Sequence, residues 1–107
     1  MEELIMKYEE LMVWEKELIT EYLEIRTQIY NIEKEIKKKE FRQEICTKSN
    51  LIDVSNERKR LEDEINILKT QCADIDNQYK QRLSEIQSLL EHITRQKVEV
   101  LLVNKLS

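Results

Sequence analysis

The chain has 107 residues, of which 37% are charged and 6% aromatic, and it contains neither glycine nor proline. This composition is typical of long helices and coiled coils, and it argues against a compact globule with many tight turns. The net charge of -4 is spread unevenly, because bases concentrate between Lys34 and Arg60.

No apolar run approaches the roughly 18 residues that a membrane span requires, and the first residues lack the basic segment of a secretory signal. The two cysteines, Cys46 and Cys72, are too few and too far apart for a disulfide framework or a zinc site. We therefore expect a reduced intracellular protein, cytoplasmic or nuclear, without a cofactor, a membrane partner or a small-molecule ligand.

The first predicted element is a helix over residues 1–46. Apolar residues in it follow alternating steps of four and three, the spacing of one seam along a coiled-coil helix. In the heptad notation abcdefg, Leu4 stands at d and Tyr8 at a. This seam consists of Leu4, Tyr8, Leu11, Glu15, Leu18, Tyr22, Ile25, Ile29, Ile32 and Ile36.

A turn or phase break is predicted at residues 47–50. The sequence Thr47-Lys48-Ser49-Asn50 concentrates side chains that compete for backbone hydrogen bonds. Ser49 or Asn50 is suited to cap a new helix, and Asp53 would favour its positive N-terminal end.

The second predicted element is a helix over residues 51–107. Its a/d seam runs from Leu51 (a) to Val103 (d) and is interrupted by Arg58, Arg82 and Gln96. If the two helices fold together antiparallel, with paired residue numbers adding up to 97, the one acid of the first seam, Glu15, meets Arg82 as a register-setting pair.

This register places Leu4 opposite Ile93 and Ile36 opposite Leu61. Residues 98–107 then extend past the first helix as an apolar C-terminal overhang. The predicted fold is therefore all-α, an antiparallel coiled-coil helical hairpin. Two alternatives remain open at this point: one long helix in an antiparallel coiled-coil dimer, and a parallel heterodimeric coiled coil.

Apolar residues beside the seam predict an interface with a helical partner or a second copy. They stand at e positions in both helices, at the g position of Trp14, and in the C-terminal segment, and they widen the apolar stripe beyond what two helices cover. These interface residues are Ile5, Met12, Trp14, Ile19, Leu83, Leu90, Val100, Leu101, Leu102 and Val103.

Bases near the predicted turn form a candidate basic tip. It could meet nucleic acid or an acidic partner, although interleaved glutamates also suit an ordinary solvated face. The tip consists of Lys37, Lys38, Lys39, Arg42, Arg58, Lys59 and Arg60.

No sequence motif indicates an enzyme or a metal site. The only histidine, His92, falls at a g position with no second histidine near it, and Cys72 at an a position reads as a small core residue. The expected function is a non-enzymatic scaffold that assembles subunits of a larger complex, by analogy with coiled coils of cytoskeletal, centrosomal and chromosome-associated assemblies. The alternative is an arm that binds nucleic acid or an acidic partner through the basic tip.

Overall fold

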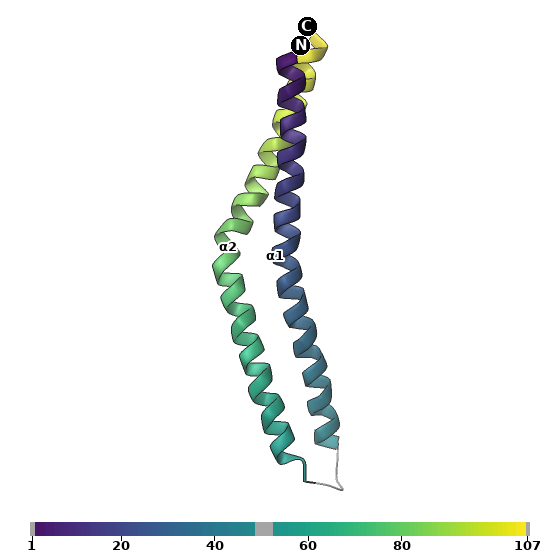
Figure 1. Ribbon diagram of the computed structural model, residues 1–107, viewed down its shortest axis with the longest axis vertical. Coiled ribbons are helices and arrows are strands. Elements are labelled where there is room, and N and C mark those ends of the chain that lie inside the picture. Colours follow the sequence, from purple (N-terminus) through teal and green to yellow (C-terminus); the bar gives the residue numbers. More distant parts are fainter. Residues whose placement is uncertain (1, 49–52, 107) are drawn as a thin grey trace. The chain divides into compact units, whose positions relative to one another are not determined.

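The chain folds into two long α-helices that pack against each other as a hairpin (Figure 1). The structure is a computed structural model that describes residues 2–48 and 53–106. Helix α1 spans Glu2–Lys48 and helix α2 spans Ser55–Leu106. The chain therefore pairs with itself, as the hairpin prediction requires, and neither alternative, the single unbroken helix or the parallel heterodimer, is the arrangement found.

Local sequence explains why both helices are so long. Neither contains the glycine or proline that would end it. Acidic residues in the first turns and lysines in the last turns of both helices complement the helix dipoles. Ion pairs along α1 add support, for example between the Lys7 Nζ and a Glu3 carboxylate oxygen at 3.1 Å.

The connection between the helices differs from the predicted break. Thr47 and Lys48 belong to α1. The Thr47 hydroxyl donates to the Gln43 carbonyl at 3.0 Å, so this side chain forms a hydrogen bond within the helix and does not end it. The predicted caps, Ser49 and Asn50, lie outside the described residues. The expected start of the second helix at Leu51 lies outside them too.

Helix α2 begins at Ser55 with a cap from Asp53. The Ser55 backbone N–H donates to the Asp53 carboxylate at 3.0 Å, and the Arg58 N–H donates to the Val54 carbonyl at 2.9 Å. The bonds from Ser55 lower the pKa of Asp53, because they stabilise its ionised form. The prediction that Asp53 would favour this helix end agrees with these bonds.

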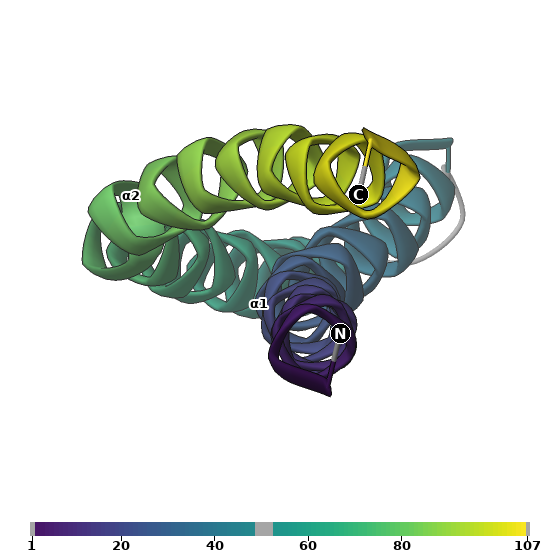
Figure 2. The same ribbon diagram turned by 90° about the horizontal axis from the view of Figure 1, so that it is seen from above.

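The hairpin divides into two compact units, which are described separately below. The terminal unit joins Met1–Ile25 to Lys80–Ser107, and the middle unit is Arg26–Tyr79. In the terminal unit the first turns of α1 and the last turns of α2 lie at the same end (Figures 1 and 2).

The core of each unit is the predicted seam. In the terminal unit, the residues buried between the helices are Leu18, Ile25, Ile86 and Ile93. In the middle unit they are Ile29, Ile36, Leu61 and Ile65. All eight stand at a or d positions, so the heptad pattern identified the buried face of both helices.

Candidate interaction surfaces

The predicted interface residues do not form a single patch. In the terminal unit, Ile5 and Trp14 line two different grooves, which share only Val100. Positions e and g flank a coiled-coil seam on opposite sides, so the e residue Ile5 and the g residue Trp14 are separated by the helix pair itself.

The groove on the e side has a volume of about 210 Å³. Ile5 and Leu101 provide exposed apolar side chains there, and half-buried Tyr8 and Val100 lie beneath them. The complete lining is Leu4, Ile5, Tyr8, Glu9, Val100, Leu101 and Asn104.

The groove on the g side has a volume of about 340 Å³ and contains Trp14. Exposed Met6 lies in the same groove, although the sequence analysis did not select it. The complete lining is Met6, Lys7, Glu10, Leu11, Trp14, Gln96 and Val100. A tryptophan beside apolar neighbours and two charged residues is the composition of a typical interface hot spot.

The other predicted interface residues differ in exposure. Met12 and Ile19 on α1 are exposed, whereas Leu83 and Leu90 on α2 are half-buried. Leu90 packs against the buried core of the terminal unit. The e-side surface is therefore continuous with the hydrophobic core beneath it.

The C-terminal segment lies beside α1 at least as far as Asn104, which shares a groove with Leu4 and Tyr8. Val100 lies in the seam beside Leu4, and Leu101 lies beside Ile5. Leu101, Leu102 and Val103 nevertheless remain about half exposed, at 51–53%. The prediction that this segment has no counterpart on α1 is thus wrong, but its outer side remains an uncovered apolar surface.

The expected pair of Glu15 with Arg82 is replaced by two other interactions in the terminal unit. The Lys97 Nζ donates to both carboxylate oxygens of Glu15, at 3.0 and 3.2 Å. The Arg82 guanidinium donates to both carboxylate oxygens of Glu21, at 2.5 and 3.0 Å. The Arg82 side chain lowers the pKa of Glu21, because these hydrogen bonds favour the carboxylate.

The reason for the different pairs is a shift in register. Leu4 lies beside Val100 instead of Ile93, which moves its partner by about one heptad, or seven residues. The middle unit shows a similar displacement, because Lys39 pairs with Glu64, which lies six residues beyond Arg58, the residue that the predicted register places opposite Lys39. A shift of one heptad still places a residues opposite d residues, so the seam pattern alone does not distinguish the two registers.

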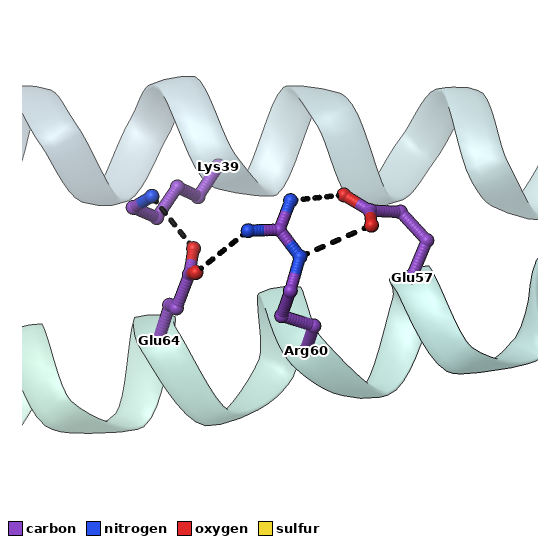
Figure 3. A network of polar contacts seen from close by, with 4 residues as sticks. All are labelled: Lys39, Glu57, Arg60 and Glu64. Carbon is purple, nitrogen blue, oxygen red and sulfur yellow. Dashed lines mark hydrogen bonds and ion pairs between the residues drawn. The ribbon is translucent and has the colours of Figure 1, made fainter.

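Three of the seven bases of the predicted tip pair with glutamates within the middle unit. The Lys39 Nζ donates to Glu64 at 2.7 Å, and Arg60 bridges Glu64 and Glu57 on α2 (Figure 3). Lys39 lowers the pKa of Glu64 most strongly, through its hydrogen bond. Lys38 pairs with Glu35 on the same helix turn.

The remaining bases of the tip have no ion pair among the described residues. They are Lys37, Arg42, Arg58 and Lys59, and all four are exposed. Arg58 and Lys59 line an open groove of about 710 Å³ together with Glu40, Glu44 and Glu62. Both signs of charge therefore meet on this surface, and it is not a uniform basic patch.

Three functional features were missed by the sequence analysis. Lys97, Glu21 and Glu64 supply partners of the interhelical ion pairs, but they stand beside the seam and the sequence analysis did not single them out. The steps of three and four continue beyond Ile36 to the half-buried Lys39, Gln43 and Cys46. Following these steps would have placed Lys39 on the face that meets α2.

The described part of the chain offers little for metal or thiol chemistry. In residues 2–48 and 53–106, no group of three or more His, Cys, Asp and Glu side chains could hold a metal ion. Cys46 and Cys72 are both free and half-buried, and desolvation raises the pKa of the Cys72 thiol. His92 is exposed on α2. Neither described helix has a stretch long and apolar enough to cross a membrane.

Comparisons with protein-family models, with curated proteins and with solved structures find no match for this chain.

Proposed function

We propose that this chain is a non-enzymatic coiled-coil interaction module that holds subunits of a larger assembly together through its terminal unit. The observation that carries the proposal is the exposed apolar surface on both sides of the terminal seam. Ile5, Met12 and Ile19 stand on one side and Trp14 with Met6 on the other. Exposed apolar side chains gathered beside the seam of a helix pair mark a candidate protein-binding site.

The chemistry of the partner follows from the shape of the surface. Each groove lies beside the seam and offers apolar side chains from both helices, which suits the apolar face of another helix. The pattern extends the two-helix seam to the wider stripe of a three- or four-helix bundle. A helical protein segment is therefore the proposed partner.

The alternative function, a basic arm for nucleic acid or an acidic partner, receives less support. Lys38, Lys39 and Arg60 already bind glutamates of their own chain. Binding to phosphates would have to compete with these carboxylates or depend on the four unpaired bases. The Phe41 side chain is exposed, but a single aromatic residue is a small platform for stacking bases.

Site-specific photo-crosslinking in the cells that produce the protein tests the proposed interface. A photoreactive residue at Met12 or at Trp14 should form a cross-link to a protein, because both positions are exposed in the terminal unit. The matched control is Ile67, which is more exposed, at 59%, but belongs to the middle unit. Equal labelling from all three positions, or none from Met12 and Trp14, would count against the proposal.

The basic arm has its own test. If the alternative is right, the protein binds duplex DNA or RNA with an affinity that decreases steeply with salt, and the double substitution Lys37→Glu with Lys59→Glu abolishes this binding. We expect no such binding. A salt-dependent affinity that disappears in the double variant would replace the scaffold proposal with the arm.

A further inference from the structure

One side of the terminal unit carries a largely apolar face, interrupted on α2 by Lys97 and here called the e face. Residues at e positions of the two helices lie on the same side of an antiparallel pair. Leu90 links this face to the buried core, and Leu101 extends it toward the helix ends. The e face consists of Ile5, Met12, Ile19, Leu83, Leu90 and Leu101.

Two charged residues of α1 lie within the outer row of this face. Ile5, Glu9, Met12, Lys16, Ile19 and Leu23 follow each other in steps of four and three, so they form a second stripe beside the seam. Every member of this stripe is exposed. Among the described residues, neither Glu9 nor Lys16 forms an ion pair, and at seven residues apart, about 10 Å along the helix, they do not reach each other.

The order of these residues favours a particular partner. If the stripe meets a copy of itself running in the opposite direction, Ile5 faces Leu23 of the copy and Met12 faces Lys16. Glu9 then lies within one turn of Lys16 of the copy, and the two-fold axis repeats this pair. A copy running in the same direction would instead place Glu9 against Glu9 and Lys16 against Lys16, and like charges in such contacts are unfavourable.

The c positions, which lie on the g side of α1, restrict where a copy docks. Glutamates occupy all four of them in the terminal part of α1, and all four are exposed. A second copy that approached this side would bring like charges together. The stripe of e and b positions from Ile5 to Leu23 is therefore the side of α1 that is open to self-association. These glutamates are Glu3, Glu10, Glu17 and Glu24.

We propose that the e face binds a second copy of this chain, with α1 antiparallel to α1 of the partner, so that the two terminal units form a four-helix bundle. The inference rests on the proposed function and specifies its partner. The buried apolar faces supply the attraction, and the complementary charges of Glu9 and Lys16 select the antiparallel orientation. The Trp14 groove on the g side stays available for a different helix.

The mass of the purified full chain in solution tests whether the partner of the e face is a second copy. Light scattering coupled to gel filtration should give twice the monomer mass of 13.0 kDa. Met12→Lys should weaken the dimer at least about tenfold, because it places a second ammonium group opposite Lys16 of the copy. Val13→Lys is the matched control, since Val13 is as exposed as Met12, at 50% against 49%, but lies at an f position off the stripe.

Charge reversal tests the orientation. Glu9→Lys and Lys16→Glu should each weaken the dimer, because each creates a like-charge contact across the two-fold axis, whereas the double variant should restore its affinity. Circular dichroism of every variant checks that the helices remain intact. Loss of the dimer without rescue in the double variant would overturn the antiparallel arrangement.

The outcomes separate this inference from the proposed function. A monomeric mass at all protein concentrations overturns the second copy as partner. If cross-links from Met12 to a different protein persist in that case, the scaffold proposal stands and only the identity of its partner changes. A dimer that Met12→Lys and Val13→Lys weaken equally would place the contact elsewhere and would also overturn the inference.

Discussion

The terminal and middle units have nearly the same core but different outer surfaces. Each buries four leucine or isoleucine side chains along one a/d seam. Outside the seam, the terminal unit presents Ile5, Met12 and Trp14 to solvent, whereas the middle unit presents a network of bases and glutamates around Arg60. The comparison teaches that the seam specifies the hairpin, while the flanking positions determine which part of it can bind a partner.

The interhelical ion pairs differ between the units as well. In the terminal unit, Glu15 lies in the seam and is bound by Lys97, and both side chains are about three-quarters buried. In the middle unit, the cation occupies the seam, because half-buried Lys39 reaches out to Glu64. Both arrangements satisfy a charge at a core position from the opposite helix, which leaves no buried side-chain polar atom without a partner among the described residues.

The largest expected effect comes from a cross-linking test of the helix register, because a linker either joins two cysteines or does not. With Cys46 and Cys72 replaced by alanine, the pair Leu4→Cys with Val100→Cys should be joined by a short bismaleimide linker within one chain. The pair Leu4→Cys with Ile93→Cys should not, because Ile93 lies about two turns away along α2. Efficient linkage of the second pair alone would restore the register expected from the sequence.

Cavities in the two cores should cost similar amounts of stability. Ile86→Ala in the terminal unit and Leu61→Ala in the middle unit each remove a side chain with 0% exposure. Each should lower the free energy of unfolding by about 2–5 kcal/mol, measured by urea denaturation. Ile67→Ala, at an exposed position, should change it by less than about 0.5 kcal/mol. A small effect at Leu61 alone would show that the middle unit is not held by its seam.

A double-mutant cycle in the terminal unit should give a smaller change in the free energy of unfolding. Lys97→Ala leaves the half-buried Glu15 carboxylate without its partner and should destabilise the hairpin by about 1 kcal/mol. Glu15→Ala in the same background should then have little further effect, so the two substitutions are coupled. The same cycle between Glu15 and Arg82 should show no coupling, because Arg82 binds Glu21 instead.

The smallest effect concerns pH and the network of the middle unit. Because Lys39 and Arg60 hold the pKa of Glu64 below its ordinary value, the folded state binds this proton less tightly than the unfolded state does. The stabilisation is therefore present above about pH 4.3, the unfolded value, and is lost as the pH falls through the folded pKa.

Glu64→Gln should lower the stability at neutral pH and make its decrease on acidification shallower, as followed by urea midpoints. Glu62→Gln on the same helix is the control, since Glu62 forms no ion pair in the described part of the chain. Identical pH profiles for the two variants would contradict the role of the network.

Heptad periodicity made the fold predictable, but only to the nearest heptad. The seam residues from Leu4 to Ile36 are all buried or half-buried, and those from Leu61 to Val100 are as well. Only Arg58 and Val103 among the described seam positions are exposed. A seven-residue repeat is equally compatible with two registers that differ by seven residues. It therefore does not identify the partners of Glu15 and Arg82.

The candidate surfaces were predictable as residues but not as an arrangement. Sequence spacing selected Ile5, Met12 and Trp14, because apolar side chains at e and g widen the stripe. Only the packed helices separate Trp14 from Ile5 by placing them in different grooves. Likewise, the spacing placed Lys39 near other bases, whereas packing placed it against Glu64.

The amino-acid order by itself determined two long helices, the face that each buries, and the apolar character of the terminal positions, since these are properties of neighbours within one or two helical turns. The tertiary structure decided how far one helix is displaced along the other, which charges pair across the seam and which apolar residues share a groove. Those outcomes depend on contacts between residues far apart in the chain, and a repeating seam makes several such alignments almost equally favourable.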